Sequence, residues 1–584
     1  MCNNEAIFNF NVCFRNHMLE SRKKTAVWML GLLILVVTVS QAIWIAVDTR
    51  PHVFGDPYVI TTIRSYDQFS AKGPAAVFDK SFMRMRLWGR PILYQLMAMP
   101  LIPLLGRDED PMIALNLLFY VVLMVSVYRA TALIKNPGTG LLAAVIVSVY
   151  PPVISLLKCP RPHALLPACT ALVVWGMVSL LKNPSRKTAW GWGAALGLSA
   201  WVHPNGIFLL GPLSFLFGIY FLCAGRCEMN TAVPSLPRRI ALGVRSTFFW
   251  KGLVPGALVA FGLTALWYVP NFKPLYDSLG YAERCCRDGG ISFFSVSYSP
   301  LWYLKTMPGA LSNYFAALLL ISLVAFLFSK NRERRLLSVG FIILAVLITG
   351  RPPAAFSWVY FAVNLPVAAI ATALFVTDAR DWLMGKIGRG VRIFKIVGNG
   401  FLTVTIIYAA FNFYVLNAPL PAWANAVAGF SGSPKDGTCA ERLNVAYCPN
   451  PPLAEDWRIP EVLTVIGRDP RCLDRNQCTV TMVSEIMAEE FHHGMLAFFL
   501  IRDFPRINIK LSGVVLVLSE TGDLVLDHTL DWLSADYVAY IPGYQAYPYD
   551  GAVARLLERE TAAPSFLYEI AAVSVLPKGR ELKL

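Results

Sequence analysis

Hydrophobic residues in this chain are gathered into long runs, with polar residues between the runs. The runs AVWMLGLLILVVTVSQAIWIAV, ALLPACTALVVWGMVSLL and NYFAALLLISLVAFLF carry no charged residue. A helix of about 20 apolar residues crosses a hydrocarbon core of about 30 Å, so such runs predict transmembrane helices. About eleven are expected, at residues 27–47, 111–134, 139–157, 162–181, 188–203, 206–225, 250–270, 310–329, 336–350, 357–377 and 396–416.

The pattern changes sharply after about residue 417, where the chain becomes polar and mixed. Strand-like runs such as GVVLVLSE and ADYVAYI alternate there with helix-like stretches near 481–500 and 548–560, which is typical of a small α/β domain. The predicted fold is therefore an all-α polytopic membrane domain followed by a soluble α/β domain. The expected divisions are a 1–26 N-terminal segment, a 27–416 membrane domain with external loops 48–110 and 271–309, and a 417–584 tail.

The composition agrees with a membrane protein. Hydrophobic residues make up 56% of the chain and charged residues only 15%, against roughly 25% charged in soluble domains. The net charge of +15 does not indicate nucleic-acid binding, because the cations lie in short segments between apolar runs and form no separate basic domain.

The cationic segments also predict an orientation. They lie at 22–24, 182–187, 226–251, 330–335 and 386–395. With an odd number of helices these segments all share one side, which the positive-inside rule makes the cytoplasm. The N-terminus is then inside and the tail outside. Loop 48–110 is external in this scheme although it carries many arginines, which suggests that an anion binds there.

Cysteines are frequent in the predicted external parts of the chain. Two close pairs lie in the tail, and such pairs are typical of disulfides in an oxidising compartment. A zinc site is the alternative, but no pair has CxxC spacing and His492 is directly followed by His493. The four tail cysteines expected in disulfides are Cys439, Cys448, Cys472 and Cys478.

Ionisable residues are almost absent from the predicted spans, and unusual polar residues gather at their external ends instead. A proton- or ion-coupled transporter usually has acids, histidines or broken helices near the midplane. The pattern here favours a site at the outer membrane surface. The residues at these ends are Asp56, Lys158, Arg161, His163, His203, Asn205 and Arg351.

This layout suits chemistry on a lipid-linked anion, such as a polyprenyl phosphate whose head group lies at the interface. Guanidinium groups bind phosphate bidentately and stay charged. An acceptor that attacks an anomeric carbon needs a carboxylate as general base, and the departing phosphate needs cations or a divalent metal. The cofactor is unknown, and a metal remains possible.

Four segments resemble the GT-C superfamily of membrane glycosyltransferases, in particular the protein O-mannosyltransferases and the lipid A aminoarabinose transferase, in the manner of glycosyltransferase family 39. They are FGDPYVITTIRSYDQF, GRPILYQLMAMPLIPLLG, YPPVISLLKCPRPHALLPACTAL with GLSAWVHPNGIFLLGPL, and RPPAAFSWVYFAVNLPVAAIATAL. The likeness covers about 400 residues. Each motif is weak alone, and their order and topology carry the resemblance.

The resemblance implies that Asp56 is the first-loop aspartate, which acts as general base or holds the acceptor and a metal. Many members have a second acid directly after it, where this chain has Pro57. Asp56 as a helix cap is the alternative. Tyr58 and Arg64 follow on the same helical stretch as substrate-binding candidates, although an i,i+3 ion pair between Arg64 and Asp67 is equally open.

The same resemblance implies phosphate or donor contacts for five further residues, Arg90, Arg161, His163, His203 and Arg351. The alternatives are an interfacial anchor for the arginines and a satisfied helix cap for His203. The expected function is inverting transfer of a sugar from a polyprenyl-phosphate donor to an acceptor at the external face. A lipid-linked sugar flippase, a non-catalytic assembly component and a plain membrane anchor are the rival functions. The sugar and the acceptor (glycan, lipid or protein) stay open, and the expected location is a bacterial inner membrane with the tail in the periplasm.

Overall fold

The structure is a computed structural model that describes residues 3–47, 56–73, 91–224, 249–273, 311–349, 361–385 and 392–417, with short strands and a few single residues elsewhere. These residues form two units. The first comprises residues 1–43, 79–94 and 113–451, and the second comprises 44–78, 95–112 and 452–584. Each unit is described by itself below.

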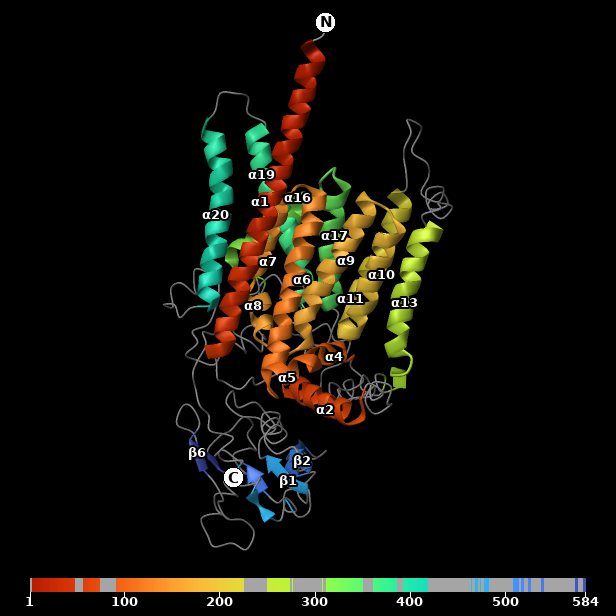
Figure 1. The fold of residues 1–584 in the computed structure, drawn as a ribbon, viewed down its shortest axis with the longest axis vertical. Coiled ribbons are helices and arrows are strands. Elements are labelled where there is room, and N and C mark those ends of the chain that lie inside the picture. The colour runs from red at the N-terminus through yellow and green to blue at the C-terminus, as the bar shows by residue number, and fades with distance from the viewer. Residues whose placement is uncertain are drawn as a thin grey trace. The chain divides into compact units, whose positions relative to one another are not determined.

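The first unit is a bundle of helices (Figure 1). It contains most of α1 (Asn3–Val47) and of α6 (Asp110–Ile134), and these further elements: α7 (Pro137–Ser148), α8 (Pro151–Leu157), η3 (Pro162–Ala164), α9 (Leu165–Lys182), α10 (Arg186–Val202), α11 (Pro204–Ala224), η4 (Phe249–Leu253), α13 (Val254–Tyr268), α16 (Asn313–Leu327), α17 (Arg332–Thr349), η6 (Ala362–Asn364), α19 (Leu365–Gly385) and α20 (Arg392–Asn417). Local signals start several of them. The Asn136 side chain accepts a hydrogen bond from the backbone N–H of Thr139, and Ser185 and Thr188 form a capping box at α10.

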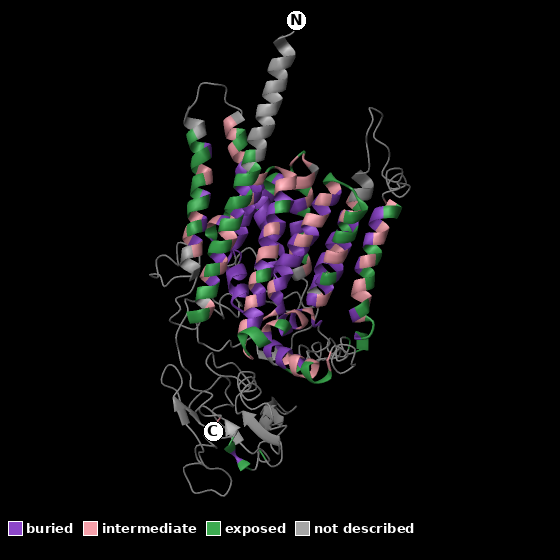
Figure 2. Cartoon of the chain, viewed as in Figure 1, coloured by how far each residue is buried: buried purple, intermediate pink, exposed green. Residues whose placement is uncertain are grey.

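Burial separates central helices from peripheral ones (Figure 2). In the most apolar window of α19 and η6, 83% of residues are buried inside the protein, against 22% in the windows of α13 and α20. The exposed residues of the peripheral helices are themselves large and apolar, for example Phe261 on α13 and Ile407 on α20. Side chains of this kind are stable on a surface that faces lipid.

Among the residues that the structure describes, each of the eleven segments predicted to span the membrane contains helix, although the limits differ by a few residues and one segment is divided in two. Within the described residues, six helices are long and apolar enough to cross a membrane, or seven if one bent pair counts as a single span. The helical, multi-pass fold is therefore confirmed, while the number eleven remains a prediction.

The bent pair is the segment predicted as one helix over 139–157. The structure divides it into α7 and α8, whose axes differ by 68°. Tyr150 lies in extended backbone between them, and Pro151 and Pro152 begin α8. A residue before proline is pushed out of helical geometry and a proline lacks the amide hydrogen, so this pair of prolines ends one helix and starts another.

Helices α10 and α13 pack in parallel and very closely. A methyl group on Gly193 would collide with the carbonyl oxygen of Gly256, and one on Gly197 would meet Leu263. Tyr268 also donates a hydrogen bond of 3.2 Å to the carbonyl of Ala200. Small residues allow this approach of two backbones, which is how helices commonly associate in membranes.

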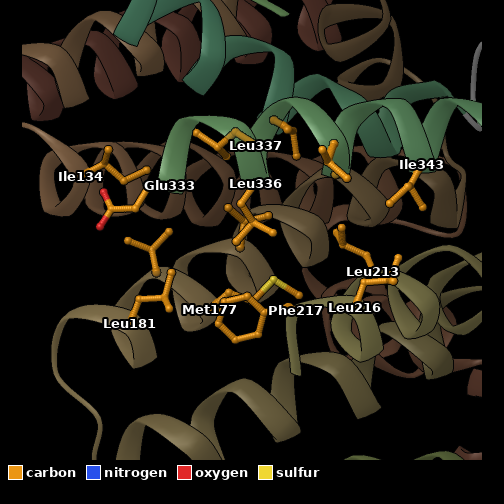
Figure 3. Close-up of a pocket in the computed structure, with 15 residues that line it drawn as sticks. Ile134, Met177, Leu181, Leu213, Leu216, Phe217, Glu333, Leu336, Leu337 and Ile343 are labelled. Carbon is orange, nitrogen blue, oxygen red and sulfur yellow. The ribbon is translucent and has the colours of Figure 1, made fainter. Parts of the chain in front are cut away.

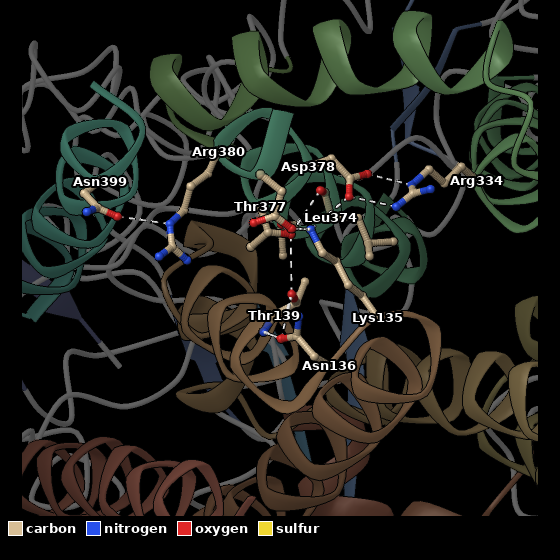
Figure 4. Close-up of polar contacts among 11 residues, drawn as sticks. Lys135, Asn136, Thr139, Arg334, Leu374, Thr377, Asp378, Arg380 and Asn399 are labelled. Atoms are coloured by element: carbon tan, nitrogen blue, oxygen red, sulfur yellow. Dashed lines mark hydrogen bonds and ion pairs between the residues drawn. The ribbon is translucent and has the colours of Figure 1, made fainter. Parts of the chain in front are cut away.

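Ion pairs hold one end of the bundle, at the C-terminal ends of α6 and α19 and the N-terminal end of α17 (Figure 4). Asp378 accepts hydrogen bonds from Lys135 at 2.9 Å and from Nη2 of Arg334 at 2.7 Å. Its second carboxylate oxygen forms an ion pair with Nε of Arg334 at 2.6 Å. Lys135 also contacts Asp381, and Lys182 of α9 pairs with Glu333 of α17. We call this set of charges the ion-paired end.

The second unit contains α2 (Asp56–Lys72), η2 (Met99–Leu101), α5 (Ile102–Leu105), most of α4 (Leu93–Ala98) and the strands of the tail. β1 (Gln477–Met482) lies between β2 (Asn508–Gly513) and β5 (Tyr537–Ala539), parallel to both, with Val480 opposite Leu511 and Tyr537. β3 (Leu516–Leu518) pairs with β4 (Leu524–Leu526), and β6 (Val573–Val575) with β7 (Glu581–Lys583), both antiparallel. Parallel neighbouring strands need crossover connections, in keeping with the predicted α/β tail. The helices of this tail and its limits remain predictions.

Candidate functional site

Two buried histidines meet at the end of the bundle opposite the ion-paired end. His163 lies in η3, just before α9, and α9 carries Lys182 at its other end, about 27 Å away along the helix. His203 follows the last residue of α10. The two imidazole rings have centroids 4.6 Å apart at an interplanar angle of 44°, and the residues are only 4% and 5% exposed. The structure therefore brings together two of the predicted substrate-binding residues.

His163 is positioned by the connection between α8 and α9. Lys158 ends α8, and its amide bonds to the carbonyl of Ser155 at 3.1 Å. Arg161 then lies in extended backbone as the N-cap of η3, with its amide 2.7 Å from the carbonyl of Cys159. Pro162 follows at the first position of η3, where its fixed φ and missing amide hydrogen are tolerated.

A single asparagine of α6 holds this connection in place. The Asn116 amide nitrogen donates to the carbonyls of Leu156, Leu157 and Cys159, at 3.1, 3.4 and 2.7 Å. Its amide oxygen accepts from the Tyr94 hydroxyl at 2.8 Å. Carbonyls at a helix end have no partner within the helix, so Asn116 supplies the partner that water cannot supply in an apolar interior.

His203 is positioned by a tight turn between α10 and α11. Its backbone is extended, its amide points to the Ser199 carbonyl at 3.5 Å, and its own carbonyl accepts from the Gly206 amide at 2.8 Å. Pro204 begins α11 directly afterwards. A side chain on Gly206 would collide with the Ser199 carbonyl, so glycine is required for the turn.

The site combines hydrogen-bonding groups with positive charge. Lys158 is buried and Arg161 half-buried, and both belong to the connection that carries His163. Imidazoles donate or accept according to tautomer, while lysine and arginine only donate. A cluster of this kind is suited to the oxygens of a phosphate or a sugar.

Three further predicted residues lie on α2 in the second unit. Asp56 is the first residue of α2, at the position expected of a helix-capping residue, and its side chain is not among those described. Tyr58 is buried and Arg64 is exposed. Asp67, which the sequence suggested as a partner of Arg64, instead binds Arg107 through two hydrogen bonds of 2.8 and 2.6 Å.

The remaining predicted residues lie outside the described part of the chain. They are Arg90, Arg351, Cys439, Cys448 and Cys472. Cys478 lies on β1, but its side chain is not described. Roles and disulfides proposed for these residues stay predictions. Among the described residues no three His, Cys, Asp or Glu side chains cluster in a way that would hold a metal ion.

Sequence reasoning missed several buried amides in the bundle, among them Asn116 and Asn364. Asn364 lies in η6, which packs against α9, and neither of its amide atoms has a hydrogen-bond partner in the described structure. Phe361 fixes η6 by an edge contact with Phe341 of α17, at 6.2 Å between centroids. A lone asparagine inside an apolar run was the available signal, because such residues are costly in a membrane.

Comparisons with known proteins agree with this architecture. The family of dolichyl-phosphate-mannose-protein mannosyltransferases matches residues 89–250. ArnT from Cupriavidus metallidurans in the apo state is similar in structure, with a TM-score of 0.52 and 14% identity, covering 95% of this chain and 97% of that one. The same protein bound to undecaprenyl phosphate gives a TM-score of 0.51 and 12% identity, over 95% and 98% of the two chains.

The apo oligosaccharyltransferase of Archaeoglobus fulgidus matches with a TM-score of 0.47 and 12% identity, over 78% of this chain and 62% of that one. No curated protein sequence shows a significant match. The low identities to ArnT show a shared fold and no more. The chain is thus an integral multi-pass membrane protein that resembles the dolichyl-phosphate-mannose-protein mannosyltransferases over residues 89–250 and has the fold of the GT-C glycosyltransferases.

Proposed function

We propose that this protein is a glycosyltransferase that moves a sugar from a polyprenyl-phosphate donor to an acceptor at the external face of the membrane. One observation carries the proposal. The paired histidines, their positioning asparagine and the neighbouring cations all lie inside residues 89–250, the segment that matches the mannosyltransferase family. The part of the chain most similar to a glycosyltransferase family thus holds a built polar cluster at one end of an apolar bundle.

The fold supports a lipid-phosphate donor. ArnT, which shares the fold, has been crystallised with undecaprenyl phosphate. In the present chain, Lys158 and Arg161 bring positive charge to the same connection that carries His163. We assign these four residues to the donor phosphate and the first sugar, because phosphate oxygens only accept hydrogen bonds and need donors around them.

The reaction follows from this assignment. An acceptor oxygen forms a bond to the anomeric carbon while the bond from that carbon to the phosphate oxygen breaks. The phosphate leaves with the bonding electrons, and the configuration at carbon inverts. From the sequence resemblance, we propose that Asp56 takes the acceptor proton as general base. The cations stabilise the charge that develops on the phosphate.

The test is a transfer assay with purified protein in lipid nanodiscs and a panel of radiolabelled polyprenyl-phosphate sugars. We expect at least one donor to be turned over, Asp56→Asn to lose about 100-fold or more in kcat, and His203→Ala to raise KM for the donor. Asp67→Asn is a matched control on the same helix that removes a carboxylate already paired with Arg107. Turnover of no donor, or full activity of Asp56→Asn, would contradict the proposal.

A lipid-linked sugar flippase is the second candidate, and the break between α7 and α8 favours it. Transporters commonly carry discontinuous helices whose ends form binding sites within the membrane. In this chain, however, Asn116 already satisfies carbonyls at the end of α8. An assay in sealed vesicles distinguishes the two functions. A flippase moves a fluorescent polyprenyl-phosphate sugar across the bilayer without cleaving it, whereas a transferase releases the lipid phosphate.

A further inference from the structure

An apolar crevice opens on the side of the bundle between α11 and α17 (Figure 3). Phe217 and Met177 line its floor and are almost fully buried. Leu216 and Val339 line its rim and are 39% and 42% exposed. The space between these side chains is about 660 Å³, part of it open to the outside. A crevice of this form is accessible from the lipid and not only from the helix ends.

The length of the crevice matches one leaflet of a bilayer. Its lining runs along α17 from Glu333 to Ile343, which corresponds to about 15 Å at the helical rise of 1.5 Å per residue. The hydrocarbon core of a bilayer is about 30 Å thick, so one leaflet supplies about half of that. A lipid chain that begins at the ion-paired end would extend along the crevice to the middle of the membrane.

The chemistry of the lining also selects the occupant. Fourteen of the fifteen lining residues are uncharged and apolar, and the exception is Glu333, which lies at the ion-paired end and pairs with Lys182 at 2.5 Å. A polar ligand would find no hydrogen-bond partners in the remainder of the lining. The Lys182 ammonium and the Glu333 carboxylate complement the phosphate and amine of a phospholipid head group.

We propose that this crevice is a lipid-binding site that holds one hydrocarbon chain of a phospholipid from the leaflet on the ion-paired side. The site is separate from the proposed donor site, because the crevice extends from the ion-paired end whereas the histidine pair lies at the opposite end of α9. The bound chain fills space between α9, α11 and α17 and so supports the packing of the helices that carry His163 and His203.

A substitution at Gly340 tests the proposal most directly, because it fills the crevice. Gly340 lies in the crevice, and a Cβ at this position would meet the Leu213 side chain at 3.2 Å, so a leucine side chain would enter the space. Gly262 on α13 is a matched control, because it is exposed and a Cβ there would meet nothing within 4 Å. The substitutions Gly340→Leu and Gly262→Leu change the composition identically, but the first places its side chain in the crevice and the second places it on an exposed face.

The experiment is lipid counting by native mass spectrometry, after purification in mild detergent and washing to remove loosely bound lipid. We expect one phospholipid per chain in the wild type and in Gly262→Leu, and a loss of about tenfold or more in Gly340→Leu. Val339→Trp, at the exposed rim, should give the same loss without disturbing the core. Equal phospholipid retention in all four proteins would overturn the proposal. Retention of a polyprenyl lipid in its place would also overturn it, because the crevice would then belong to the donor site.

Discussion

At the scale of single residues, two of the buried asparagines of the bundle differ in how well their amides are bonded. Asn116 and Asn364 are both fully buried. Asn116 makes four hydrogen bonds to the chain, whereas both amide atoms of Asn364 lack a partner in the described structure. Burying a polar group that has no hydrogen bond costs free energy, because the group loses its bonds to water. A hydrogen bond within the protein offsets that cost.

This contrast predicts opposite effects of one substitution. Asn364→Leu removes an unsatisfied amide and should raise the free energy of unfolding by about 1–2 kcal/mol. Asn116→Leu leaves helix-end carbonyls without a donor and should lower it by about 1–3 kcal/mol. Thermal denaturation of both variants in the same detergent measures the difference. A lower midpoint for Asn364→Leu would mean that its amide is bonded, for example by a fixed water.

At the scale of helices, the sequence predicts their positions well and their breaks poorly. Hydropathy detects residues that avoid water, and it averages over a whole window, so residues 139–157 read as one helix. The direction of the chain depends on local backbone chemistry at Tyr150, Pro151 and Pro152, which contribute little to that average. The contact between His163 and His203 could not be predicted either, because it depends on how two connections pack.

The close approach of α10 and α13 gives a prediction with an internal control. Gly193→Ala places a methyl group against the Gly256 carbonyl and should destabilise the bundle by about 1–3 kcal/mol. Gly191→Ala, on the same helix, meets nothing within 4 Å and should stabilise α10 by about 0.5–1 kcal/mol through helix propensity. Unfolding curves of the two variants measure both effects. Equal midpoints would show that the two helices are not in contact at Gly193.

The ion-paired end gives a second prediction for the helices. Asp378 binds both Lys135 and Arg334 and its side chain is 29% exposed, so Asp378→Asn should destabilise the bundle by about 1–3 kcal/mol. Asp381 contacts the same lysine, but its side chain is 51% exposed, and Asp381→Asn should cost less than about 1 kcal/mol. Denaturation at low and high salt distinguishes the two variants, since screening weakens the more exposed Asp381 pair more strongly.

For the whole molecule, the order of the helices along the chain links the two ends of the bundle to the two sides of a membrane. Ser185 precedes α10 near Lys182 of the ion-paired end, and Phe272 follows α13. Because α10 and α13 run in parallel, these two exposed residues lie at opposite ends of the bundle. The positive-inside rule predicts that the end with Ser185 faces the cytoplasm.

This sidedness is testable with single cysteines introduced at Ser185 and Phe272 in a background without reactive native thiols. In intact cells, a membrane-impermeant maleimide should label Phe272→Cys and leave Ser185→Cys unlabelled until the membrane is opened. The reverse pattern would invert the topology and place the histidine pair on the cytoplasmic side. Labelling of both from one side would contradict the assignment of α10 and α13 as membrane-spanning helices.

The hydrogen bonds of Asn116 have a consequence for motion on slow timescales. The connection over residues 158–164 is not regular helix, and connections of that kind usually open easily and exchange their amide hydrogens with solvent. Here the amides of Arg161 and Ala164 are bonded within the connection, and Asn116 fastens it to α6. Opening would break several bonds at once in an apolar medium. Hydrogen–deuterium exchange over these residues should therefore be as slow as in the adjoining helices, and Asn116→Leu should make it fast.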